Sequence, residues 1–262
     1  MNFLLDKENE YKEIYYSKVH KFFKETPITI YIIAVNFFLF ILIHSLESET
    51  DAWKLGTLNL PMIYPKGEYF RFITAYFLHI HPLHIIFNMF SLFMVGPFIE
   101  HIFGKINFFI LYMFTGLVST VSSYLITMPP EAVGASGAIF GIVGGFTTFL
   151  IMYKDKLKQD IRKKLLINIF VVVGINLAFG LFSSIGVTGS IQVDNAAHVG
   201  GLLSGAIIAI FLKPEALETG KKKISLAIAL LYLVIILASF AWMGYTYILD
   251  SRKIDFLIRY FK

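Results

Sequence analysis

Long uninterrupted apolar stretches dominate this chain of 262 residues. A helix needs about 20 mainly apolar residues to cross the hydrocarbon core of a bilayer. The stretches lack the roughly ten-residue alternation of a membrane barrel, and backbone groups in lipid must be paired internally, so each stretch is predicted to be a helix. Seven stretches approach or exceed the required length: 28–46, 84–103, 107–127, 136–153, 165–183, 196–212 and 224–249.

The composition excludes several classes of protein. Hydrophobic residues make up 56% of the chain and charged residues only 16%, whereas a soluble domain carries about 25% charge. A soluble enzyme, a disordered protein and a coiled coil are therefore excluded. The absence of cysteine rules out disulfides, thiol chemistry and cysteine-based metal sites. The net charge of +5 is spread between the apolar stretches and forms no single basic face, which argues against nucleic-acid binding.

The distribution of Lys and Arg predicts how the chain is oriented. With the N-terminus inside, 16 of the 23 basic residues fall on inside segments and seven on outside segments, although the basic C-terminal tail argues against this arrangement. We expect residues 1–27 to form a short N-terminal cytoplasmic segment, for which a polar tail and an interfacial amphipathic helix fit equally. Residues 28–212 are expected to form a six-helix core, and residues 213–262 a cytoplasmic linker, a seventh helix and a tail.

The outside connection from 47 to 83 contains many apolar residues and fewer polar ones than an ordinary solvated loop. We expect it to pack into or against the outer leaflet of the membrane.

Polar side chains inside spanning helices are costly, so each one needs a reason. His84 and Asn88 are four residues apart and share one helix face. Ser136 lies where a loop becomes a helix, next to unpaired N–H groups and the positive end of the helix dipole. His198 lies near the outer start of the sixth stretch. In the orientation given above, all four residues lie at a similar depth below the outer surface.

Each of these residues also has a purely structural interpretation. His84 and Asn88 can link two helices, Ser136 can be a helix N-cap, and His198 can make an interhelical hydrogen bond. Together, however, a serine, a base and extra hydrogen-bond donors are the components of an acyl-transfer site. Because Asp194 lies on the loop side of His198, we predict a Ser–His dyad and not a triad.

Three motifs on the second, fourth and sixth stretches make the chain resemble the rhomboid family of intramembrane serine proteases. The resemblance covers about residues 28–212 and keeps the family's order of motifs. The motifs are His84-x-x-x-Asn88, Gly134-Ala135-Ser136-Gly137 and Ala197-His198-x-x-Gly201-x-x-x-Gly205.

The resemblance implies a fold and a role for each of the four polar residues. The fold would be that of an all-α membrane protein, a helical bundle with a rhomboid-like six-helix core and one C-terminal transmembrane helix. Ser136 would be the nucleophile and His198 the general base. His84, Asn88 and the backbone N–H of Ser136 would form the oxyanion hole.

The resemblance extends to residues around this site. Gly201 and Gly205 would pack the sixth helix against the fourth. Phe140, where some members carry Tyr, would stack under His198. Arg71 matches the family's Trp-Arg loop motif, with Phe70 in place of the Trp, and His79 fits a family histidine upstream of the second helix.

The implied activity is that of a serine endopeptidase that hydrolyses peptide bonds in or near transmembrane segments of membrane proteins. Its partners would be those substrates and the lipid bilayer, with no nucleic acid, metal or cofactor. The compact length and short tails favour a bacterial plasma membrane, and the orientation given above puts the site on the outside. The resemblance implies that substrates enter sideways past the fifth helix and a cover around residues 183–194.

Two other functions stay open at this point. A rhomboid-fold protein can bind transmembrane clients without cutting them, but such pseudoproteases typically lack the serine or the histidine. A transporter or channel could use the polar residues as a solute path. Against it, acidic residues are absent from the helix centres, and the polar groups cluster on one side.

Overall fold

The computed structural model describes residues 25–45, 56–59, 63–64, 66–128, 131–184, 193–212 and 214–215. Within these ranges the chain is a bundle of helices with one very short β-ladder. The α-helices are α2 (Pro27–His44), α5 (Arg71–Thr74), α6 (Pro82–Phe103), α7 (Lys105–Ser122), α8 (Ser136–Met152), α9 (Gln159–Ser184) and α10 (Asn195–Ile208). The 3₁₀ turns are η1 (Ala75–Phe77) and η3 (Lys154–Lys156), and a π-helical turn, η2 (Ser123–Thr127), extends α7. Strands β1 (Leu58–Asn59) and β2 (Glu131–Ala132) pair antiparallel.

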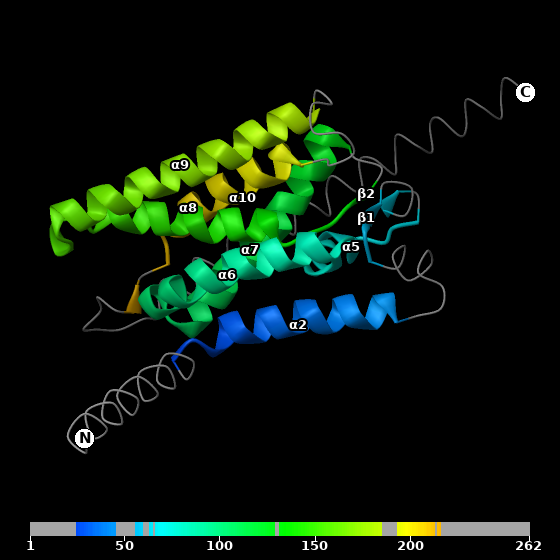
Figure 1. Cartoon of the computed structure of the whole chain (residues 1–262), viewed down its shortest axis with the longest axis horizontal. Helices are drawn as coiled ribbons and strands as arrows, with labels where there is room; N and C mark the ends of the chain where they lie inside the picture. Colours follow the sequence, from blue (N-terminus) through cyan, green and yellow to red (C-terminus); the bar gives the residue numbers. More distant parts are fainter. Residues whose placement is uncertain are drawn as a thin grey trace, which may run out of the picture.

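The long helices lie side by side, with the β-ladder at one end of the bundle (Figure 1). Helices α7, α8 and α10 pack on one another, and α2 packs on α6. In the described part of the chain, α2, α6 and α7 with η2 are long and apolar enough to cross a membrane, while α8 and α10 are apolar but shorter. The predicted fold class, an all-α multi-pass membrane protein, is confirmed.

The described helices follow the first six apolar stretches, with shifts at their ends. Helix α9 starts at Gln159, six residues before the predicted stretch, because its basic first turns are helical although they are not apolar. Helix α10 ends at Ile208, and residues 209–212 form a turn. The predicted seventh helix, most of the N-terminal segment and most of the cover at 183–194 lie outside the described residues.

Glycines allow α8 and α10 to pack with their backbones in contact. A Cβ atom on Gly201 would lie 2.0 Å from the carbonyl oxygen of Gly137, and one on Gly205 would lie 1.8 Å from that of Gly141. Any side chain at these two positions would therefore push the helices apart. The close packing predicted from Gly201 and Gly205 is confirmed, and it sets the starts of α8 and α10 side by side.

A buried carboxylate anchors α2 to the far end of α6. Glu100 is only 1% exposed, and its oxygens accept hydrogen bonds from the backbone N–H groups of Ile28 (3.0 Å) and Thr29 (2.8 Å). The Thr29 hydroxyl donates a third bond at 2.7 Å. The first N–H groups of a helix have no partner within the helix, and the helix dipole favours negative charge there. Glu100 therefore caps α2 from a neighbouring helix.

The described part of the connection between α2 and α6 packs against the protein, while its predicted contact with the outer leaflet stays a prediction. Its apolar residues contact the C-terminal half of α7 and are buried there. The members of this cluster are Leu58, Ile63, Phe72 and Ala75 from the connection, with Leu117 and Val121 from α7.

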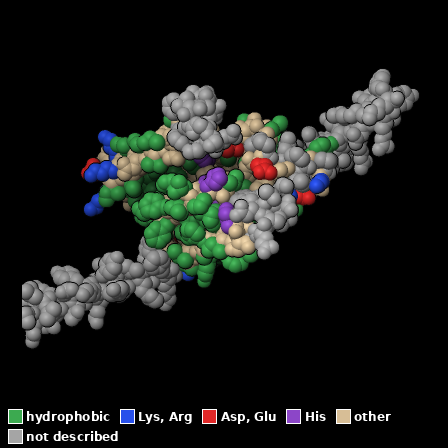
Figure 2. All heavy atoms as spheres, turned by 45° about the vertical axis from the view of Figure 1, so that its right-hand side comes forward, with side chains coloured by type: hydrophobic (Ala, Val, Ile, Leu, Met, Phe, Trp, Pro, Cys, Tyr) green, Lys and Arg blue, Asp and Glu red, His purple; other side chains and the backbone are tan. Residues whose placement is uncertain are grey.

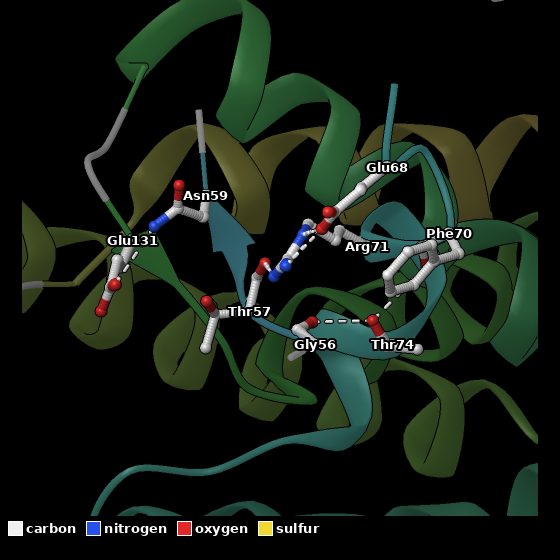
Figure 3. A network of polar contacts seen from close by, with 8 residues as sticks. All are labelled: Gly56, Thr57, Asn59, Glu68, Phe70, Arg71, Thr74 and Glu131. Carbon is white, nitrogen blue, oxygen red and sulfur yellow. Dashed lines mark hydrogen bonds and ion pairs between the residues drawn. The ribbon is translucent and has the colours of Figure 1, made fainter. Parts of the chain in front are cut away.

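Arg71 organises the polar side of this connection (Figure 3). The residue is 3% exposed, its Nε and Nη2 donate to Glu68 Oε2 at 2.7 and 2.5 Å, and its Nη1 donates to the Thr57 carbonyl at 2.9 Å. The adjoining strand β1 pairs with β2, and Asn59 Nδ2 donates to Glu131 Oε1 at 3.2 Å. The connection is thereby joined to the loop that leads into α8.

Candidate active site

Ser136 and His198 meet where α8 and α10 begin. Ser136 is the first residue of α8 and Ala135 occupies the N-cap position without a side-chain cap, so the N-cap interpretation of Ser136 is wrong. The Oγ of Ser136 lies 2.8 Å from Nε2 of His198. This hydrogen bond joins residues 62 positions apart and is the contact that a serine nucleophile and its base require.

The ring of His198 is held on one face by an aromatic ring. Phe140, one turn after Ser136, stacks on it with ring centroids 4.3 Å apart and an interplanar angle of 5°. His198 is 5% exposed, and its Nδ1 is buried without a hydrogen-bond partner among the residues that the structure describes. A neutral imidazole has one donor and one acceptor nitrogen, so Nε2 accepts from Ser136 in the tautomer that carries its proton on Nδ1.

His84 and Asn88 contact the loop that enters α8. Gly134 has a φ of +120°, and a Cβ atom there would lie 2.6 Å from His84 Nε2 and 3.9 Å from Asn88 Nδ2. Only glycine combines this backbone conformation with so close a neighbour. Asn88 Nδ2 also donates to the backbone oxygen of His84 at 3.0 Å. Both side chains of the first motif therefore lie beside the residues that precede Ser136.

His79 contacts the same loop. The side chain is 1% exposed, and its Nε2 accepts a hydrogen bond from the backbone N–H of Ala135 at 3.4 Å. Its ring lies edge-on to that of His84 at 5.0 Å. Burial, followed by the nearby His84, lowers the pKa of His79 to about 3, so its ring is neutral at physiological pH. The sequence indicated His79 through the family pattern but gave no sign of its contact with Ala135.

Asp194 has a larger role than the sequence indicated. It is the N-cap of α10, where its Oδ1 accepts from the N–H of Ala197 at 3.0 Å. Its Oδ2 accepts from the hydroxyl of Ser123, and from that of Thr127 at 3.3 Å. An Asp just before a helix is a recognisable cap signal. No local signal in the sequence links it to Ser123 and Thr127, about 70 positions earlier.

The Rhomboid domain family matches residues 66–215, more than half of the chain. The chain belongs to the rhomboid family. Ser136, His198, His84 and Asn88 all lie within the matched residues.

Named rhomboids from a bacterium and a plant are similar to this chain. It is 33% identical over 174 residues to rhomboid protease GluP of Bacillus subtilis, which covers 64% of this chain and 32% of that protein. It is 34% identical over 169 residues to RHOMBOID-like protein 6, mitochondrial, of Arabidopsis thaliana, which covers 63% of this chain and 50% of that protein. RHOMBOID-like protein 1 of the same plant is 33% identical over 159 residues, which cover 59% of this chain and 37% of that protein. The chain thus spans between a third and a half of the length of these relatives.

The face of this rhomboid in Figure 2 shows histidine side chains near its middle, bordered by hydrophobic side chains. Many of its Lys and Arg side chains gather at one end, where η3 joins α8 to α9. Within the described ranges, no group of three or more His, Cys, Asp or Glu side chains is arranged to hold a metal ion.

Proposed function

We propose that this rhomboid is an intramembrane serine endopeptidase that hydrolyses peptide bonds in or near transmembrane segments of membrane proteins. The observation that carries the proposal is the 2.8 Å hydrogen bond between Ser136 Oγ and His198 Nε2. The family of the chain and its similarity to the rhomboid protease GluP add support.

In this mechanism Ser136 is the nucleophile and His198 the general base. Nε2 of His198 takes the hydroxyl proton while Oγ attacks the peptide carbonyl carbon, giving a tetrahedral intermediate and an imidazolium. The imidazolium then gives its proton to the leaving amine as the C–N bond breaks, which leaves an acyl-enzyme. Water, deprotonated by the same imidazole, hydrolyses the ester and restores both side chains.

The developing negative charge on the carbonyl oxygen needs donors in fixed positions. The N–H of Ser136 is at the start of α8, where backbone N–H groups have no partner within the helix. His84 and Asn88 lie beside Gly134, two residues before Ser136. We assign these three donors to the oxyanion hole, with Gly134 allowing the His84 ring to approach.

The short inner helices support access of water to the site. At 1.5 Å per residue, the 17 residues of α8 and the 14 of α10 span about 26 and 21 Å, less than the roughly 30 Å hydrocarbon core. If their far ends reach the inner surface, Ser136 and His198 lie below the outer surface. A non-helical backbone at that depth requires a water-filled cavity or surrounding protein. We propose that this recess opens outward, in a membrane whose inner side holds the N-terminus.

The test is cleavage of a reporter with one transmembrane helix, reconstituted in liposomes with the full chain. Wild-type protein should cut the reporter and react with a fluorophosphonate probe, and Ser136→Ala and His198→Ala should reduce cleavage at least about 10³-fold. Ser91→Ala and His101→Ala are the matched controls, because both side chains are exposed on α6 and outside the dyad.

Two outcomes would contradict the proposal. Folded wild-type protein that binds the reporter but neither cuts it nor reacts with the probe would be a client-binding protein. Equal cleavage by wild type, Ser136→Ala and His198→Ala would mean that another protease or another site is responsible.

A further inference from the structure

The first turn of α10 carries His198, and a single residue holds two backbone groups of this turn. The side chain of Asp194 accepts from the N–H of Ala197 at 3.0 Å, and its backbone oxygen accepts from the N–H of His198 at 3.1 Å. The position of the imidazole along the bundle therefore depends on where Asp194 lies.

The carboxylate of Asp194 is itself fixed to another helix. Its Oδ2 accepts hydrogen bonds from the hydroxyls of Ser123 and Thr127, which belong to η2 at the end of α7. Ser123 is buried. A carboxylate offers two oxygens and about four acceptor positions, so it can cap α10 and bind η2 at the same time. A serine or threonine cap has one oxygen and cannot accept all three donors.

The ring of His198 has few contacts of its own outside α8. Its Nδ1, which an acidic residue orients in a Ser–His–Asp triad, has no partner in the described part of the chain. Its other contacts, the Phe140 ring and Ser136 Oγ, both belong to α8. A small shift of α10 against α8 would therefore lengthen the bond between Oγ and Nε2, and misplacement by about 1 Å can cost 10²-fold in rate.

We propose that Asp194 is a positioning residue of the dyad: its carboxylate anchors the first turn of α10 to η2 and thereby holds His198 Nε2 at Ser136 Oγ. The inference rests on the proposed function. Asp194 makes no hydrogen bond to a reacting atom, and in this role it acts through the position of the helix.

Three variants separate the cap on α10 from the hydrogen bonds between Asp194 and η2. Asp194→Ala removes both the cap and the tie to η2. Asp194→Asn keeps an oxygen for Ala197, since Asn is as good an N-cap as Asp, and its amide can pair with the Ser123 hydroxyl. Ser123→Ala keeps the cap and weakens the tie. Asp160→Ala is the matched control, because this exposed Asp lies in the first turn of α9.

The measurement is kcat and KM for the reporter in liposomes, per active site titrated with the fluorophosphonate probe, alongside the melting temperature. Asp194→Ala should lower kcat at least about tenfold with KM within about threefold of wild type. Asp194→Asn should restore kcat to within about threefold, and Ser123→Ala should fall between them. A role in stability alone would lower the melting temperature and leave kcat per titrated site unchanged.

The inference is overturned if Asp194→Ala keeps the wild-type kcat per titrated site. Equal losses in Asp194→Ala and Asp194→Asn would also overturn it, because the charge and not the anchoring would then be responsible. If Asp194→Ala does not fold, an unchanged kcat in Ser123→Ala decides against the inference. Inactive wild-type protein would defeat the proposed function and this inference with it. If wild type is active and Ser136→Ala is inactive, the proposed function stands. An unchanged kcat in Asp194→Ala then contradicts only the positioning role.

Discussion

Nε2 of His198 bonds to Ser136, and Nδ1 has no partner in the described part of the chain. The orientation of the ring therefore depends largely on stacking. Phe140 lies flat against the ring and prevents it from tilting, although it offers no hydroxyl group. We expect this stacked contact, together with the hydrogen bond to Ser136, to define the plane in which Nε2 faces Oγ.

This dependence predicts the behaviour of Phe140 variants. Removing the ring in Phe140→Ala forfeits a contact of about 0.5–1.5 kcal/mol, so kcat should fall by up to about tenfold. Phe140→Tyr keeps the stack and should stay within about threefold of wild type. Reporter cleavage per titrated active site measures both. An Ala variant as active as wild type would contradict an orienting role.

His79 predicts a dependence of stability on pH. Its pKa is lowered to about 3 in the folded protein, against an ordinary value of 6.5, so only the unfolded chain binds a proton between these values. The free energy of unfolding should therefore fall by up to about 1.4 kcal/mol per unit as the pH drops from 6.5 toward 3. His79→Gln keeps an acceptor for Ala135 and should show a shallower slope. The measurement is the free energy of unfolding in detergent across this pH range. Equal pH slopes for wild type and His79→Gln would contradict the lowered pKa of His79.

At the scale of elements, the sequence predicted the helices and their close packing better than their ends and connections. Hydropathy located six described stretches because lipid demands apolar helices, yet it missed the polar first turns of α9. The β1–β2 ladder was not predicted, because strands of two residues leave no alternating pattern. The motifs indicated which polar residues would form the candidate site. The ties from His79 to Ala135 and from Asp194 to η2 depend on tertiary contacts and have no local signature.

The contact between α8 and α10 predicts a sharp contrast between two glycines. A Cβ atom on Gly205 would lie 1.8 Å from the Gly141 oxygen, so Gly205→Ala should force the helices apart and cost about 1–3 kcal/mol of stability. Gly174→Ala, in α9, meets nothing within 4 Å and should be neutral or stabilising by up to about 1 kcal/mol. Thermal denaturation compares the two variants. Equal melting temperatures would mean that α8 and α10 can separate without cost.

At the scale of the whole molecule, the distribution of basic residues predicts which ends of the bundle face the cytoplasm. The chain has no native cysteine, so single-cysteine variants report position without background. With the protein in a bacterial inner membrane, Lys156→Cys in η3 should resist a membrane-impermeant maleimide applied from outside. Glu131→Cys in β2 should react. The side chains at positions 131 and 156 are both exposed, and they lie at opposite ends of α8. The reverse pattern would contradict an inside N-terminus.

The long-range hydrogen bonds also constrain how many times the chain crosses the bilayer between the bonded residues. Two side chains that bond directly lie at one depth, so the chain between them must traverse the membrane an even number of times. The pair Asn59 and Glu131 encloses α6 and α7, the pair Ser136 and His198 encloses α8 and α9, and the pair Thr29 and Glu100 encloses α2 and α6. The first two closures place Asn59, Glu131, Ser136 and His198 on one side, because Glu131 lies just before the start of α8, and the third places Thr29 and Glu100 together. A reactive cysteine at position 131 therefore also assigns the side of Asn59, Ser136 and His198.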